Sequence, residues 1–297
     1  MAKFHESVEP CALCASQEYK KVAIEAGHDI FRCRRCGLVQ VRPLPRETSD
    51  SNKSYWQVDF DVPAIQEARL GSQLVYSYGL RRLKELTGAT LAGQNVLDVG
   101  CGMGLFLEIA KGQAANPYGI DIAGSAAQFA ETHVGIDTVK VGAFETADFP
   151  AGYFQLITGW NVLEHTSAPG RWLAKAYRLL ADDGLLLIKV PNVRFSALMS
   201  KLAPVTRALG LATMSYIATR PPLHLYGFSP NTLRKILEAA GFEVLTVEGA
   251  PVRESWGIKG AILEHLTKFL ARLTGGLLDY QVVIMAVARK RKTDELA

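Results

Sequence analysis

The chain has 297 residues, of which 48% are hydrophobic and 21% are charged, a composition typical of a globular protein with one full domain and a small module, or with two domains. Its net charge of +4 is too small to indicate a nucleic-acid partner without a local basic cluster. The first residues lack the apolar core of a signal peptide, and no later stretch approaches 18 apolar residues, so we expect a cytoplasmic protein.

Four of the five cysteines lie within the first 36 residues and form two Cys-x-x-Cys pairs. Cys11 pairs with Cys14 and Cys33 with Cys36, and the stretch 15–32 between the pairs has the length found in four-cysteine zinc sites. Gly37 follows the last cysteine and permits a tight turn. Four thiolates leave no open coordination position, so we predict a structural zinc ion in a ribbon over residues 1–43.

The role of this ribbon has two interpretations, because arginines accompany its cysteines. They are Arg32, Arg34, Arg35 and Arg42. They could contact nucleic acid, although Phe31 is the only aromatic residue there that suggests a stacking platform. Alternatively, they offset the negative charge of the zinc–thiolate centre.

The next segment, 44–88, is predicted to be a polar linker followed by a helix. Residues 46–61 are polar, and from Val62 to Leu86 apolar residues recur at helical spacing until Gly88.

From residue 89 to residue 290, short apolar runs alternate with helical stretches. The expected strands are 95–99, 117–120, 138–141, 154–159, 185–190, 242–247 and 281–288, and the expected helices are 105–111, 125–133, 169–180 and 230–240. This alternation predicts an α/β, Rossmann-like domain with a mostly parallel seven-stranded sheet and helices on both faces.

Three glycines, Gly100, Gly102 and Gly104, directly follow the first of these strands and precede a helix. Missing side chains let the backbone turn sharply there and approach a ligand closely. The next strand ends at Asp121, where a carboxylate can accept hydrogen bonds from both hydroxyls of a ribose. Cys101 lies inside this turn, and we interpret it as a small residue that fits the turn rather than a nucleophile.

The segment VLDVGCGMG at 96–104, followed by GID at 119–121, resembles the first motif and the second-strand acid of class I S-adenosylmethionine-dependent methyltransferases. The segments WNVLEH at 160–165, LLADDGLLL at 179–187 and VPN at 190–192 are similar to the ubiquinone and sugar methyltransferase branch. The resemblance covers residues 89–290. One departure is Phe154-Gln155, where the family often has Phe-Asp.

The resemblance implies a set of cofactor contacts. Asp98, with Gly100, Gly102 and Gly104, would surround the methionine part, and Asp121 and Ile122 the ribose. Phe144 or Glu145 would meet the adenine edge, and the backbone near Trp160 and Asn161 the methionine ammonium.

The long connection 193–228 is predicted to be a lid over the acceptor. From residue 184 to residue 237 there are seven basic residues (189, 194, 201, 207, 220, 234 and 235) and no acidic one. This charge favours an anionic acceptor, such as a nucleotide-linked sugar or a lipid phosphate. The open alternative is a solvated basic face, whose side chains point away from the site. The apolar segments 195–199 and 202–216 are interpreted as packing over a pocket, with contact to a membrane surface as the alternative.

Two histidines are candidates for the general base that removes the acceptor proton. His224 is the first choice because it lies at the end of the lid, and His165 is the second. His165 could instead order the loop through a hydrogen bond at a helix start, and Tyr226 could orient either histidine.

Together these features predict methyl transfer from S-adenosylmethionine to a hydroxyl of a sugar or glycan intermediate. A zinc ribbon joined to this methyltransferase type resembles proteins that act on sugars and cell-surface glycans. The alternatives are an RNA methyltransferase that uses the ribbon for binding, a quinone or lipid-ring O-methyltransferase, and a non-catalytic binding protein. We expect no nucleic-acid partner, and the sequence leaves the oligomeric state open.

Overall fold

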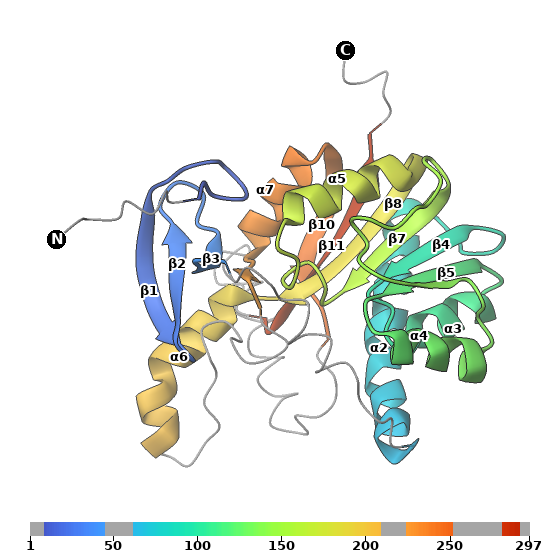
Figure 1. Cartoon of the computed structure of the whole chain (residues 1–297), viewed down its shortest axis with the longest axis horizontal. Coiled ribbons are helices and arrows are strands. Elements are labelled where there is room, and N and C mark those ends of the chain that lie inside the picture. The colour runs from blue at the N-terminus through green and yellow to red at the C-terminus, as the bar shows by residue number, and fades with distance from the viewer. Residues whose placement is uncertain (1–8, 45–61, 209–223, 252–280, 292–297) are drawn as a thin grey trace.

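The structure is a computed structural model that describes residues 9–44, 62–208, 224–251 and 281–291 (Figure 1). A seven-stranded sheet forms its centre, in the order β10-β11-β8-β7-β4-β5-β6. These strands are β4 (Asn95–Val99), β5 (Asn116–Asp121), β6 (Val139–Val141), β7 (Phe154–Trp160), β8 (Leu180–Pro191), β10 (Phe242–Gly249) and β11 (Val283–Lys290). Only β11 runs antiparallel to its two neighbours, so the predicted mostly parallel sheet is confirmed.

Helices cover both faces of this sheet (Figure 1). They are α2 (Val62–Thr87), α3 (Leu105–Gly112), α4 (Gly124–Phe129) with the π-helical turn η1 (Ala130–Val134), α5 (Pro169–Leu179) and α7 (Pro230–Ala239). Helix α6 (Val193–Ala208) follows β8 and extends away from this sheet (Figure 1). Successive side chains of a strand point to opposite faces. Accordingly, Leu185 and Leu187 of β8 pack in the core beneath α2 and α3, whereas Leu186 and Ile188 pack beneath α5 and α7.

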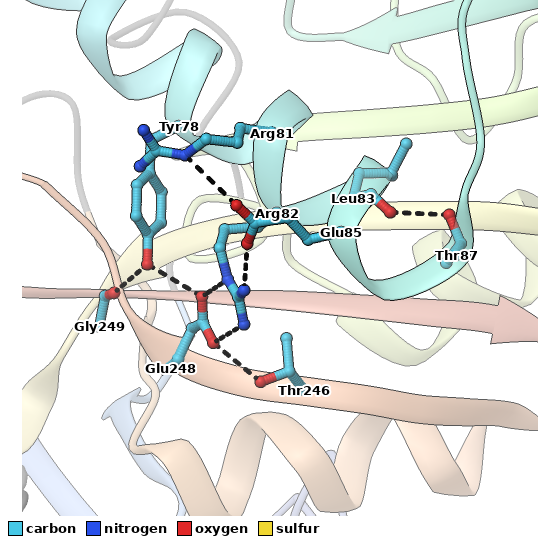
Figure 2. Close-up of polar contacts among 9 residues, drawn as sticks. All are labelled: Tyr78, Arg81, Arg82, Leu83, Glu85, Thr87, Thr246, Glu248 and Gly249. Carbon is cyan, nitrogen blue, oxygen red and sulfur yellow. Dashed lines mark hydrogen bonds and ion pairs between the residues drawn. The ribbon is translucent and has the colours of Figure 1, made fainter.

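An ion pair fastens α2 to β10 at the edge of the sheet (Figure 2). The Arg82 guanidinium donates from Nε to Glu248 Oε1 at 2.6 Å and from a terminal nitrogen to Oε2 at 3.0 Å. The Tyr78 hydroxyl donates to Glu248 Oε1 at 2.9 Å. Because Arg82 and Glu248 lie 166 positions apart in the sequence, this group holds the helix that precedes the sheet against one of its last strands.

A second sheet of four strands lies beside the first (Figure 1). Its strands are β1 (Tyr19–Glu25), β2 (His28–Cys33), β3 (Val39–Arg42) and β9 (Tyr226–Gly227). We call residues 9–42, which include β1 to β3, the ribbon. The fourth strand, β9, comes from far along the chain and pairs antiparallel with β3, Gln40 facing Tyr226. The ribbon sheet is therefore completed by a segment of the larger α/β region.

The predicted linker at 46–61 and the section 209–223 of the predicted lid lie outside the described residues. So do residues 1–8 of the predicted ribbon and 252–280 of the predicted α/β domain. The described part of the lid is α6 and the segment from His224 to Phe228. The division into 1–43, 44–88 and 89–290 stays a prediction. Among the described residues, no helix is both long and apolar enough to cross a membrane.

Candidate functional site

The two Cys-x-x-Cys turns of the ribbon share one backbone geometry. In the first, the Ala15 N–H donates to the Cys11 carbonyl at 2.9 Å, and Ala15 has a φ of 55°. In the second, the Gly37 N–H donates to the Cys33 carbonyl at 3.0 Å, and Gly37 has a φ of 84°. A positive φ therefore follows each cysteine pair, and this turn aims both thiols of a pair inward.

The four thiols converge on one point, as the sequence predicts. All four sulfur atoms lie within 4.8 Å of one another, with Cys11 Sγ 3.5 Å from Cys36 Sγ and Cys14 Sγ 3.6 Å from Cys33 Sγ. A tetrahedral zinc ion with bonds of about 2.3 Å would separate sulfur atoms by about 3.8 Å, so the cluster has the size that zinc requires. The hydrogen bond from Cys36 lowers the pKa of Cys11 to about 5 even though burial acts to raise it. A thiolate is thus favoured there at neutral pH.

The glycine turn between β4 and α3 has left-handed backbone conformations. The φ angles of Gly100, Gly102 and Gly104 are 70°, 50° and 75°. A Cβ atom on Gly100 would lie 2.5 Å from Val162 Cγ2, so the turn packs tightly against the segment that follows β7. A Cβ atom on Gly102 would meet no atom of the described structure within 4 Å. The turn is therefore close-packed on one side and open at Gly102.

The carboxylate of Asp121 lies beside this open position. Its Oδ2 accepts a hydrogen bond from the Gly102 N–H at 2.8 Å, and its Oδ1 accepts one from the Ala123 N–H at 2.8 Å. Burial raises the pKa of Asp121 although these amides act to lower it. The carboxylate is thus fixed at the carboxyl end of β5, where ligands of open α/β sheets bind.

Asp98 is a second buried acid next to the turn. Its carboxylate accepts a hydrogen bond from Thr158 Oγ1 at 2.6 Å, and its side chain is 2% exposed. Burial raises the pKa of Asp98 to about 8, and the nearby Asp121 charge adds to this effect. Among the described residues, no basic side chain forms an ion pair with either acid. A positively charged ligand bound beside these acids would lower both pKa values and favour the ionised carboxylates.

Trp160 and Asn161 lie where β7 ends. The Trp160 ring packs against Tyr76 and Phe106, at centroid distances of 4.8 and 5.4 Å. Asn161 has a φ of 58°, and its Oδ1 accepts a hydrogen bond from Lys189 Nζ at 3.1 Å. The predicted ligand contact of this segment can therefore be made by backbone that is held in a fixed turn.

The remaining predicted cofactor residues differ in their surroundings. Ile122 is 38% exposed, and Val141, which sequence reasoning did not identify, is 61% exposed on the neighbouring strand. They offer apolar surface beside Asp121. Glu145 is exposed and accepts a hydrogen bond from Thr166. The Phe144 ring is buried against Trp172, at 5.0 Å between centroids, so any contact that Phe144 makes with a ligand comes from its backbone.

The two predicted base candidates meet in the structure. The Glu164 carbonyl accepts hydrogen bonds from the amides of Leu225 and Tyr226, at 2.8 and 3.2 Å, and these bonds bring His224 next to His165. The two imidazole rings are 4.7 Å apart between centroids. Burial, assisted by His165, lowers the pKa of His224 to about 3, so His224 is neutral and weakly basic.

Glu164 completes this cluster, and sequence reasoning did not assign it a role. Its side chain is 1% exposed, and both carboxylate oxygens lack a hydrogen-bond partner among the described residues. Burial raises the pKa of Glu164 to about 8 and lowers that of the buried Lys189 to about 8. Glu164, His165 and His224 present ligand atoms within 4.8 Å of one another. The cluster could accept a proton or hold a divalent cation.

Known proteins resemble this chain over its α/β region. A family model described as a methyltransferase domain matches residues 73–247. The ubiquinone biosynthesis O-methyltransferase of Thiobacillus denitrificans is 34% identical over 111 residues, which cover 36% of this chain and 48% of that protein. The mitochondrial ubiquinone biosynthesis O-methyltransferase of Mus musculus is 31% identical over 174 residues, covering 54% of this chain and 45% of that protein. The chain thus spans about half the length of these two relatives.

A solved structure with the same fold is phosphoethanolamine N-methyltransferase 2 of Haemonchus contortus, in complex with S-adenosyl-L-methionine. It superimposes with a TM-score of 0.56 at 15% identity, over 86% of this chain and 63% of the other. This likeness concerns the fold alone.

Proposed function

The chain belongs to the methyltransferase domain family, and from this premise we propose that it transfers the methyl group of S-adenosylmethionine to a hydroxyl group of a small-molecule acceptor. The observation that carries the proposal is the glycine turn, which is open at Gly102 and adjacent to the fixed Asp121 carboxylate. The family match at 73–247 includes both features. The identity of the acceptor and the choice of a hydroxyl oxygen as the methylated atom are likewise proposed.

The residues around the turn fit the proposed cofactor. Asp121 would accept hydrogen bonds from the ribose hydroxyls, and the backbone from Gly100 to Gly104 would follow the methionine part. The buried Asp98 and Asp121 favour a positively charged ligand, and the cofactor carries both an ammonium and a sulfonium group. When bound, it supplies an electrophilic methyl group.

For proton removal, the structure favours His165 over His224, which reverses the order expected from the sequence. A base is most effective when its pKa lies near the working pH, and burial has lowered that of His224 to about 3. We therefore assign proton acceptance to His165. The ring of His224, 4.7 Å away, would restrict its orientation.

The acceptor hydroxyl is proposed to belong to a ring of the quinone-precursor type rather than to a sugar. This changes the preference drawn from the sequence, because both curated relatives described above are named ubiquinone biosynthesis O-methyltransferases. The names of these relatives thus support a ring hydroxyl as the acceptor and give no such support to a sugar hydroxyl.

The four-cysteine cluster is proposed to bind one structural zinc ion. Its support is the thiol spacing, 3.5 and 3.6 Å within two pairs, together with the two matching backbone turns. Metal analysis of the purified protein should find one zinc per chain.

The experiment uses labelled S-adenosylmethionine with a panel of acceptors: a catechol with an isoprenoid tail, nucleotide-linked sugars, and RNA. We expect label in the catechol product, and much less label at the same cofactor concentration when Asp121 is replaced by alanine. Transfer to sugars alone would contradict the ring-hydroxyl proposal while supporting methyl transfer. Failure of the protein to bind the cofactor in calorimetry would contradict the proposed activity itself.

A further inference from the structure

A cavity of about 330 Å³ lies where the ribbon meets α6 and the start of α7. The ribbon contributes Arg32, Cys36, Gly37 and Val39; α6 contributes Val193, Arg194, Ala197, Leu198 and Lys201; and Ser229, Asn231 and Thr232 come from the start of α7. A volume of this size suits part of a small molecule.

One face of α6 forms a wall of this cavity. Arg194, Ala197, Leu198 and Lys201 are spaced by three and four residues, which places them on the same side of a helix. The two basic residues lie at the ends of this face, and the smaller and apolar residues lie between them. The wall therefore presents two cations that flank an apolar floor.

Arg32 lies on the ribbon side of the cavity, so positive charge comes from two separate elements. None of the described residues that line the cavity is acidic. The opposite rim carries the Ser229 hydroxyl and the Asn231 side-chain amide. Both residues lie at the N-terminal end of α7, where the helix dipole is positive. Cations and neutral donors thus surround the same space.

The cysteine cluster does not account for all of this charge. A zinc ion with four thiolates would carry a net charge of about −2, and Cys36 is the ligand that reaches the cavity. Arg32 is close to that cluster, because its terminal nitrogen lies 3.5 Å from the position of a Cβ on Gly37. Lys201 belongs to α6 instead and approaches from the other wall.

Two segments that line the cavity are connected through the chain to residues near the proposed catalytic cluster. The last residues of strand β8, from Lys189 to Pro191, are followed by Val193 and Arg194 of the wall. The segment after His224 passes through β9 and reaches Ser229 on the rim. The amide of Val193 donates to the Phe228 carbonyl at 2.8 Å and joins these two segments.

We propose that this cavity binds an oxyanion group of the phosphate type. Arg32, Arg194 and Lys201 would be its charged ligands, and Asn231 a neutral donor. The group would be carried by the methyl acceptor, in which case this inference rests on the proposed methyl transfer, or would be a free anion. The chemistry of recognition is the same in both cases.

The test is calorimetric titration with inorganic phosphate and with glucose 1-phosphate, using glucose as the blank. We compare the wild-type protein with Lys201→Gln and Arg32→Gln. The matched control is Lys235→Gln, since Lys235 is an exposed lysine of α7 that does not line the cavity. Each cavity variant should weaken phosphate binding about fivefold, as expected for loss of one partly exposed ion pair, and added salt should weaken it further.

Two outcomes support the proposal and identify the source of the group. Binding of both phosphates, with glucose inactive, indicates an ester carried by an acceptor, whereas binding of inorganic phosphate alone indicates a free anion. Equal weakening in Lys235→Gln, or unchanged binding in Lys201→Gln, would overturn the proposal. Cofactor binding is measured in the same variants, and its absence would count against the proposed methyl transfer rather than against the anion site.

Discussion

At the scale of single residues, Asp121 joins the glycine turn to the proposed ribose contact. Replacing Asp121 with alanine should weaken S-adenosylmethionine binding about 10- to 100-fold, because a hydrogen bond to a charged group contributes about 1.5–3 kcal/mol. Asp121→Asn keeps the shape and should lose less. Calorimetry measures the affinities, and Asp137→Ala, at an exposed acid of the same βαβ unit, is the control. Equal affinity of wild type and Asp121→Ala would contradict the ribose role.

The histidine pair allows a second residue-scale prediction. His165→Ala should lower kcat about 10²- to 10³-fold, within the usual range for general-base catalysis, and should leave cofactor affinity unchanged. His224→Ala should have a smaller effect. If His224 were the base instead, its pKa of about 3 would keep it unprotonated, and the rate would not fall between pH 7 and pH 5. A larger loss of kcat in His165→Ala than in His224→Ala, with cofactor affinity unchanged in both, would identify His165 as the base.

His28→Ala serves as the control for these variants, because His28 lies on β2 of the ribbon and away from the pair in sequence and in the sheet order. Full turnover in both His165→Ala and His224→Ala would show that neither imidazole accepts the proton. Glu164, whose pKa burial raises to about 8, would then be the group to test.

At the scale of elements, the attachment of α2 to β10 can be tested through Glu248. Burial alone would raise the pKa of Glu248, but the hydrogen bonds from Arg82 and Tyr78 outweigh it and the pKa is lowered. Glu248→Gln should therefore reduce the free energy of unfolding by about 1–2 kcal/mol in urea denaturation, as expected for a charge-assisted contact that is partly buried. Arg81→Gln removes an exposed i,i+4 pair at 3.8 Å and should cost about 0.3–0.5 kcal/mol.

The pH dependence of this contact follows from the lowered pKa. The contribution of ionised Glu248 is fully present above the ordinary carboxyl pKa and is lost as the pH falls through its lower folded value. The difference in unfolding free energy between wild type and Glu248→Gln should thus be constant at neutral pH and shrink only in acid. A difference that grows as the pH falls would exclude this ion pair as the stabilising contact.

The sequence predicts the elements of the central sheet well because each strand is a short apolar run between polar or glycine-rich segments. The ribbon strands escape prediction for a physical reason. Strand β1 alternates poorly between buried and exposed positions, and β9 has two residues, so neither carries a periodic signal. The arrangement of these ribbon strands depends instead on the convergence of the four cysteines and on the pairing of β3 with β9. The π-helical turn η1, within the helix expected at 125–133, likewise leaves no sequence signal.

In the candidate site, too, the sequence predicts the local patterns but not the contacts between distant segments. The glycine turn and Asp121 are local patterns, and the structure brings them together as expected. The meeting of His165 with His224 depends on bonds from the Glu164 carbonyl to amides about 60 positions away, and no local pattern reports such bonds. The sequence carries no signal for Glu164, because a glutamate next to a histidine is usually solvated, whereas here its side chain is buried.

At the scale of the whole molecule, the ribbon and the α/β region form one connected structure. β3 pairs with β9, and the Val41 amide donates to the Leu225 carbonyl at 2.9 Å, adjacent to His224. The position of a candidate catalytic residue therefore depends on the ribbon, which is too small to bury a core of its own without a metal.

This connection predicts a selective effect of zinc removal. A chelator, or the variant Cys14→Ser, should unfold the ribbon, release β9 and lower methyl transfer at least tenfold, because a displaced His224 no longer restricts the orientation of the base, His165. Cofactor affinity should change little, since Gly102 lies in the turn after β4 and Asp121 ends β5, and both strands belong to the seven-stranded sheet rather than to the sheet of β3 and β9. Gln17→Ala, at an exposed residue of the ribbon outside the cysteine cluster, is the control and should retain zinc and activity. Loss of cofactor binding together with activity would mean that the ribbon supports the whole fold. Full activity after zinc loss would mean that the ribbon does not position His224.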